Sequence, residues 1–174
     1  AMALDLCVAY AGRSECADLA ALVQRLRVGV RLPVMVDSTR PEAVETALSL
    51  HPGRCIVNSI NLEDGGVTLD RVCRSVRRYG AAVVALTIHE GGMAMTADDK
   101  LATAKRIYER AVGQGRLRPE DLLFDTLTFT IGSGDASLRG AAAATLEAIR
   151  RIKAELPGVG TILGVSNISY GLAP

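Results

Sequence analysis

The segment Thr161-Ile162-Leu163-Gly164-Val165-Ser166-Asn167-Ile168-Ser169 joins an apolar run to a polar one. The apolar part predicts a buried strand over residues 161–165, and the polar part shows no helical continuation. Three earlier apolar runs also end on an acid or an amide: residues 34–36 precede Asp37, residues 56–57 precede Asn58, and residues 122–124 precede Asp125. We therefore expect a ring of hydrogen-bonding side chains at one end of a parallel sheet.

Apolar runs alternate with helical patterns along the whole chain. Strands are predicted at residues 4–9, 32–37, 54–58, 81–88, 122–125 and 161–165, and helices at about 14–27, 39–50, 67–79, 96–112 and 137–156. Because the strands are continuous apolar runs, we expect a parallel α/β sheet that is covered on both faces. An open doubly wound sheet and a (β/α)8 TIM barrel both fit this pattern. Polar residues at several strand ends favour the barrel, of which about six strands and five helices would be present.

Composition limits the class of protein. The 174 residues are 49% hydrophobic and 22% charged, with a net charge of +1, which predicts one folded domain with a large core. The absence of a basic excess and the 3% aromatic content argue against a nucleic-acid partner. No signal peptide and no membrane-spanning run is recognised, so a cytoplasmic protein with no membrane partner is expected.

Cysteine and histidine spacing argues against a metal site. Cys7, Cys16, Cys55 and Cys73 form no CxxC motif, and the chain has 2 histidines. We therefore predict no bound metal and interpret the cysteines as reduced, buried thiols.

Both ends of the sequence suggest a piece of a larger protein. Ala1 precedes Met2, and the chain stops at Pro174, soon after its most informative motif. We expect residues 1–174 to be a single domain that is incomplete at both ends and belongs to a multidomain or multi-subunit enzyme. Open sheet edges in such a piece would permit self-association.

The strand-end residues Asp37, Asn58, Asp125 and Asn167 suit a flat heterocycle. Two carboxylates and two carboxamides offer acceptors and donors at fixed points, and a carboxylate can accept two parallel N–H bonds from an amidine-like edge. The alternative is that these residues only cap the helices that follow. Capping is a weaker explanation for Asp37, because Thr39 is itself a good cap, and for Asn58, which lies far from any predicted helix.

The motifs Asp37-Ser38-Thr39, Val57-Asn58-Ser59, Phe124-Asp125 and Gly164-Val165-Ser166-Asn167-Ile168-Ser169 occur in this order. Together they closely resemble the pterin-binding superfamily. The greatest similarity is to the folate-binding domains of cobalamin-dependent methionine synthases. Corrinoid-linked methyltetrahydrofolate methyltransferases are similar, and dihydropteroate synthases are more distant.

The resemblance implies a (β/α)8 barrel that binds the pterin of methyltetrahydrofolate in its mouth. Asp37, Asn58 and Asp125 would bind the pterin, with Asp125 at the 2-amino and N3 edge, and Asn167 would be the catalytic contact to N5. The reaction implied is methyl transfer from N5 to the cob(I)alamin of a partner domain or subunit, in methionine synthesis. The secondary contacts expected are Asp5, Ser59, His89, Ser166 and Ser169.

Three positions depart from the family pattern. Asp5-Leu6-Cys7 stands where these families usually read Asp-x-Asn, and Thr126 stands where a proline is usual. His89 stands where methionine synthases often have an acid. It is either a loop residue near the mouth that touches nothing or a changed contact to the pterin or corrinoid.

Two alternative functions remain open from the sequence. The first is a pterin condensation like that of dihydropteroate synthase, although no basic loop for a pyrophosphate leaving group is recognised. The second is a non-catalytic folate-binding module whose chemistry belongs entirely to a corrinoid partner.

Overall fold

The computed structural model describes residues 1–132, 134–170 and 172. Its main sheet is six-stranded, with every neighbouring pair parallel, in the order β1-β2-β3-β4-β7-β8. The strands are β1 (Leu4–Cys7), β2 (Val34–Asp37), β3 (Ile56–Ile60), β4 (Ala82–Leu86), β7 (Leu122–Asp125) and β8 (Gly160–Ile162). The α-helices are α1 (Glu15–Gly29), α2 (Pro41–Leu50), α3 (Val67–Tyr79), α4 (Ala97–Tyr108) and α5 (Ala141–Glu155).

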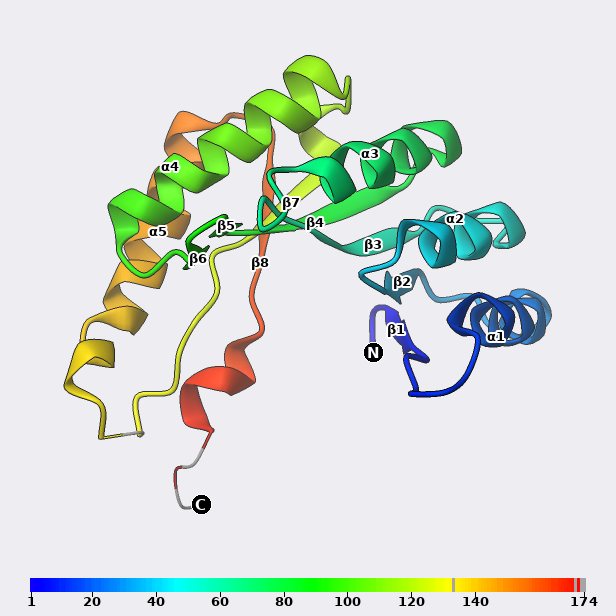
Figure 1. Cartoon of the computed structure of the whole chain (residues 1–174), viewed down its shortest axis with the longest axis horizontal. Coiled ribbons are helices and arrows are strands. Elements are labelled where there is room, and N and C mark those ends of the chain that lie inside the picture. The colour runs from blue at the N-terminus through cyan, green and yellow to red at the C-terminus, as the bar shows by residue number, and fades with distance from the viewer. Residues whose placement is uncertain (133, 171, 173–174) are drawn as a thin grey trace.

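The helices form an arc along one side of the sheet (Figure 1). Strands adjacent in this sheet follow one another in the chain, apart from the short pair β5 (Ile88–His89) and β6 (Gly92–Met93) between β4 and β7. Right-handed crossovers then place every connecting helix on the same face. A doubly wound sheet reverses its strand order and has helices on both faces. The structure therefore confirms the α/β fold and favours the barrel alternative over the doubly wound one.

The core lies between the sheet and this arc of helices. Its fully buried side chains include Val36, Val57, Val83 and Phe124 from the strands and Leu19, Val44, Leu69, Ile107 and Ile152 from the helices. The prediction that both faces of the sheet are covered was wrong. Strands β2 and β7 alternate between buried and half-buried residues, so their second face is only partly covered. Asp37 and Asp125 belong to that half-buried face.

Several element boundaries differ from the prediction. The strand expected at 81–88 ends at Leu86, and the next residues form a small antiparallel pair, β5 (Ile88–His89) and β6 (Gly92–Met93). Helix α4 passes into a π-helix, Glu109–Gln114. The strand expected at 161–165 ends at Ile162, and the polar segment after it forms a 3-10 helix, Val165–Ser169, where no helix was predicted.

The start of α3 depends on two glycines and one ion pair. Gly65 and Gly66 have φ angles of +70° and +88°, in the left-handed region. Arg110 donates to the Gly65 carbonyl at 2.7 Å and makes two hydrogen bonds of 2.8 Å to Asp70. A Cβ atom on Gly66 would lie 2.7 Å from Cζ of Arg110, whereas one on Gly65 would meet nothing within 4 Å.

We expect Gly65→Ala to lower the free energy of unfolding by about 1 kcal/mol, the cost of a left-handed alanine. Gly66→Ala should cost about 1 kcal/mol more, because Arg110 must also leave its half-exposed partner Asp70. Urea denaturation of the two variants checks this. Equal stabilities would show that the Arg110 contact contributes nothing.

No helix among the described residues is long and apolar enough to cross a bilayer.

The four cysteines, all among the described residues, are free. Only Cys55 and Cys73 are buried as expected, whereas Cys7 is exposed and Cys16 half-buried. Burial raises the thiol pKa to about 11 for Cys55 and to about 12 for Cys73, so both are protonated at neutral pH.

Candidate functional site

One group of polar residues lies on neighbouring strands β1, β2 and β3. Asp37 is the register partner of Cys7 on one side and of Asn58 on the other. The backbone N–H of Ser38 donates to the Asn58 carbonyl at 2.9 Å, which extends the β2–β3 ladder past the end of β2. Register partners in a parallel sheet project from the same face, so Asp37 and Asn58 are adjacent there.

The Asp37 carboxyl lies in an acidic environment. Partial burial is the main factor that raises its pKa above 3.8, and the charges of Asp5 and Glu15 raise it further. Glu15, the first residue of α1, is 8% exposed, and among the described residues its buried Oε1 has no hydrogen-bond partner. Glu15 was not predicted as a site residue, because an acid in the first turn of a helix is usually explained by the helix dipole.

A second group surrounds Asp125 at the end of β7. Oδ1 of Asp125 accepts a 2.7 Å hydrogen bond from the backbone N–H of Leu127, and the backbone of Gly164 also bonds the carboxyl group. Burial raises the pKa of Asp125. The bonds from Leu127 and Gly164 and the charge of Lys100 oppose that rise by favouring the carboxylate.

Lys100 is a member of this group that was not predicted from the sequence. Its side chain on α4 is fully buried. Its ammonium donates to the backbone carbonyl of Thr126 and, at 3.3 Å, to that of Leu127. A lysine near the start of a polar helix is usually solvated, so nothing in the local sequence indicated this position.

Asn167 lies in the 3-10 helix rather than at a strand end. It is exposed, and its N–H donates to the Gly164 carbonyl at 3.3 Å. Its Nδ2 would be 3.5 Å from a Cβ atom on Gly164, so the carboxamide lies beside the residue that bonds the Asp125 carboxyl group. The 3-10 helix also contacts the preceding loop, through a hydrogen bond from Ile131 N–H to the Ile168 carbonyl at 3.2 Å.

Strand β4 separates the two groups. Asn58 is the register partner of Val84, and Asp125 is that of Leu86. Asn58 and Asp125 are two strands apart across the sheet and two residues apart along the strand direction. Their backbones are therefore separated by roughly 10–12 Å. A bicyclic heterocycle lying over the apolar residues of β4 could reach polar groups at both of its edges.

The secondary residues lie in different environments. Asp5 on β1 is exposed and acts on Asp37 through its charge. Ser59 follows Asn58 on β3 and is half-buried. Ser166 and Ser169 are exposed in the 3-10 helix, where the Ser169 hydroxyl donates to the Ser166 carbonyl at 3.2 Å.

His89 is not the contact-free loop residue that one interpretation expected. Its Nδ1 accepts from the Gly91 N–H at 2.9 Å, so Nε2 carries the proton and donates to Oδ2 of Asp99 at 3.2 Å. The bond to Asp99 holds the ring against the start of α4, and the bond from Gly91 holds it against the turn between β5 and β6. The expected contact of His89 with the pterin or corrinoid stays a prediction.

The capping alternative fails for Asp37 and Asp125. The N-cap of α2 is Arg40, which has no side-chain capping bond, so the expected cap at Thr39 was wrong and Asp37 does not replace it. The Ser38 hydroxyl accepts from the Arg40 N–H at 3.1 Å instead. Asp125 bonds the N–H of Leu127, which begins no helix. Their position is therefore not explained by helix capping.

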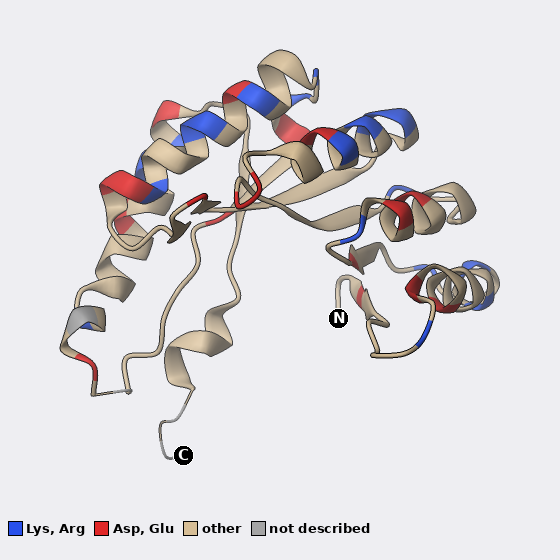
Figure 2. Ribbon diagram, in the orientation of Figure 1, with Lys and Arg blue, Asp and Glu red and all other residues tan. Residues whose placement is uncertain are grey.

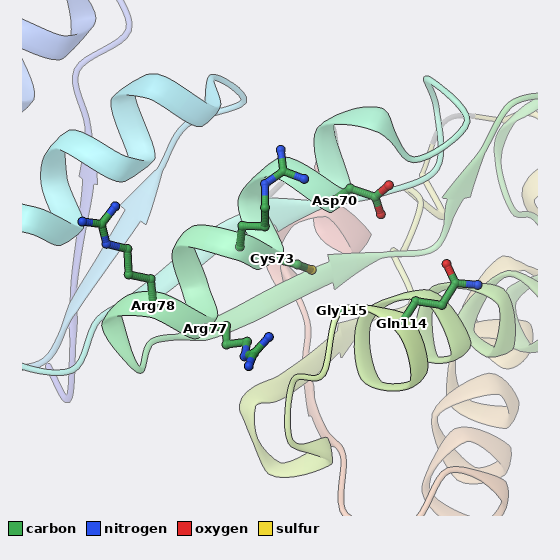
Figure 3. A pocket seen from close by; sticks show the side chains of 7 residues that line it. Asp70, Cys73, Arg77, Arg78, Gln114 and Gly115 are labelled. Carbon is green, nitrogen blue, oxygen red and sulfur yellow. The ribbon is translucent and has the colours of Figure 1, made fainter.

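A cavity of about 570 Å³ lies elsewhere, between α3 and the end of the π-helix (Figure 3). None of the predicted site residues lines it; its lining residues are Asp70, Cys73, Arg74, Arg77, Arg78, Gln114 and Gly115. The charged residues in Figure 2 lie mainly on the helices, whereas β8 and the 3-10 helix after it carry none. Across the described residues, no three His, Cys, Asp or Glu side chains gather as a metal site would require.

Solved structures with this arrangement include two dihydropteroate synthases. The enzyme from Stenotrophomonas maltophilia, with imidazole bound in its active site, aligns with a TM-score of 0.62 and 20% identity over 94% of this chain and 60% of its own. The enzyme from Xanthomonas albilineans, in complex with 7,8-dihydropteroate, aligns with a TM-score of 0.63 and 19% identity over 95% of this chain and 58% of its own. At this identity the likeness concerns the fold alone.

Sequence relatives are closer. The chain is 45% identical to methionine synthase of Mycobacterium tuberculosis and 42% identical to that of Mycobacterium leprae, over 98% of its own length. It spans only 15% and 14% of the length of those two proteins. The family model described as "Pterin binding enzyme" matches residues 1–174. With a matching fold and this match over its whole length, the chain belongs to the pterin-binding enzyme family.

Proposed function

We propose that this chain binds methyltetrahydrofolate at the carboxyl ends of its strands and presents the N5-methyl group to cob(I)alamin. The corrinoid would belong to a partner domain or subunit, and the chain would be the folate-binding part of a longer cytoplasmic methyltransferase of the methionine synthase type. The observation that carries the proposal is the placement of Asp37 and Asp125 at the ends of β2 and β7. Asn58 lies beside Asp37, within β3 rather than at its predicted end, because that strand continues to Ile60. The 42–45% identity to two methionine synthases favours methyltetrahydrofolate among pterins.

The pterin would span the two polar groups of the site. Its 2-amino and N3 hydrogens would be donated to the Asp125 carboxylate, which Leu127 and Gly164 already hold in place. Asp37 and Asn58 would bind the other edge of the heterocycle. Half-buried carboxylates suit this role, because a charge-assisted pair is stronger where water is partly excluded.

Asn167 would act at N5. When the N5–methyl bond breaks, its electron pair stays on N5, which must then gain a proton or a strong hydrogen bond. The carboxamide of Asn167 can donate to N5 but cannot supply the proton, so the proton would come from water. A hydrogen bond that strengthens as charge develops on N5 lowers the barrier. The corrinoid supplies the methyl acceptor.

A condensation like that of dihydropteroate synthase is the second candidate. Two dihydropteroate synthases share the fold, but they are at most 20% identical to this chain, whereas the methionine synthases are 42–45% identical. In a non-catalytic module the chain would bind folate without accelerating transfer.

Calorimetric titration of the 174-residue chain distinguishes a methyltetrahydrofolate site from a condensation site. We expect saturable binding of methyltetrahydrofolate with one site per chain and much weaker binding of dihydropterin pyrophosphate. Preference for the pyrophosphate would favour condensation. Binding of neither pterin would contradict the proposal, provided that circular dichroism shows the chain to be folded.

A further inference from the structure

Lys100 is a fully buried cation next to the carboxyl end of β7, where Asp125 lies. Its exposed fraction is 0%, and its ammonium donates to two successive backbone carbonyls, those of Thr126 and Leu127. Its Nζ also lies 5.2 Å from the centre of the Phe129 ring. Burying an ammonium is costly unless its donors are satisfied, so these contacts compensate a real desolvation cost.

The backbone that Lys100 binds is also the backbone that holds Asp125. Leu127 has a φ of +54°, an unusual conformation for a residue with a branched side chain. In this conformation its N–H donates to Asp125 while its carbonyl accepts from Lys100. The Leu127 carbonyl also accepts from the Thr145 hydroxyl of α5 at 2.7 Å. Two helices therefore fix one residue, and that residue orients the carboxylate.

Lys100 and Asp125 also interact through their charges. Burial lowers the pKa of Lys100 to about 8, while the charges of Asp125 on β7 and Asp99 on α4 counteract that decrease. The positive charge of Lys100 in turn lowers the pKa of Asp125. At neutral pH the ammonium therefore favours the carboxylate form, which is the form that can accept both N–H groups of a pterin edge.

We propose that Lys100 is a positioning residue for pterin recognition: its ammonium fixes the Thr126–Leu127 backbone, and thereby the orientation and the charge of the Asp125 carboxylate. The proposal rests on the proposed function in one respect, namely that Asp125 receives the pterin. The link between Lys100 and Asp125 can be tested without any ligand.

The ligand-free test is a carbon-13 NMR titration. In Lys100→Met, the carboxyl of Asp125 should titrate at a higher pKa than in the wild type. By reciprocity, Asp125→Asn should shift the titration of the Lys100 ε-carbon below its wild-type pKa of about 8. The second variant is nearly isosteric, so it decides the question even where Lys100→Met does not fold. Unchanged pKa values in both folded variants, or in Asp125→Asn alone, would overturn the coupling.

The ligand-binding test separates positioning from structural support. Lys100→Met should weaken methyltetrahydrofolate binding at neutral pH by at least about tenfold and move the acid-side loss of affinity to higher pH. Thr145→Val removes the other hydrogen bond to the Leu127 carbonyl but no charge. It should therefore weaken binding less and leave unchanged the pH at which affinity is lost. Lys105→Met, on the exposed face of α4, is the control and should bind as the wild type does.

The outcomes are distinct. If Lys100→Met and Thr145→Val weaken binding equally, and neither shifts the pH at which affinity is lost, Lys100 is only structural and the proposal is wrong. If the NMR shifts occur as expected but the wild type binds no methyltetrahydrofolate, the proposed function fails while the Lys100–Asp125 coupling stands.

Discussion

Asp125→Asn is expected to weaken methyltetrahydrofolate binding by about 100-fold at neutral pH, or ~3 kcal/mol. The carboxamide can accept only one of the two N–H bonds of the pterin edge, and its own NH₂ group would face the other. Asp125 is held by Leu127 and Gly164, so it cannot rotate away to relieve that conflict. Calorimetric titration of the variant measures the change.

Asp98→Asn is the matched control for Asp125→Asn. Asp98 lies in the first turn of α4, its side chain is 88% exposed, and it pairs with Arg151. The same chemical change there should leave the dissociation constant within about twofold, because surface charges far from the ligand contribute little. An equal loss in both variants would mean that the effect at Asp125 is not specific.

Binding should also weaken as the pH falls. Burial raises the pKa of Asp125 above 3.8, so the carboxylate gains a proton at a higher pH than an ordinary aspartate does. The neutral acid cannot accept two N–H bonds, so affinity is full above the raised pKa and is lost as pH falls through it. This acid-side loss should be much reduced in Asp125→Asn, leaving only the contribution of Asp37, whose pKa is also raised. If the affinity of the wild type for methyltetrahydrofolate rose toward acid pH, the assignment of the Asp125 carboxylate to pterin binding would be contradicted.

Asn167→Ala should slow methyl transfer by about 10²–10³-fold while changing the dissociation constant of methyltetrahydrofolate only slightly. The reason is that its hydrogen bond to N5 becomes strong only as the methyl group leaves. The measurement is the rate of transfer to cob(I)alamin at saturating substrate. Tyr170→Phe, an exposed position immediately after the 3-10 helix, is the control. Weak binding with a normal maximal rate in Asn167→Ala would assign Asn167 to binding alone.

Much of the fold was predictable because strand and helix periods are strong local signals. The ends of β2 and β7 at Asp37 and Asp125 were located correctly, since an apolar run stops abruptly there. The end of β8 was not, because Gly164 and Val165 prolong an apolar run whose backbone has already left the sheet. The half-buried face of β2 and β7 was also missed, because apolar residues such as Met35 and Leu123 can line either a covered face or a ligand site.

The candidate site was predictable only where polar residues interrupt apolar runs. Asp37, Asn58 and Asp125 carry that signal, and the sheet register places the first two side by side. Lys100 and Glu15 lie on helices, where charged residues are common, and only the packing of α4 and α1 against the sheet brings them to the site. Their role depends on tertiary contacts that no local pattern encodes.

The most direct test of the central claim is the absorbance of free cob(I)alamin mixed with methyltetrahydrofolate and the 174-residue chain. We predict that the wild-type chain accelerates the loss of the cob(I)alamin signal and the formation of tetrahydrofolate in equal amounts, and that Asp125→Asn at the same concentration is far slower. A folded wild-type chain that binds methyltetrahydrofolate but gives no rate above the chain-free mixture would contradict the proposed methyl transfer.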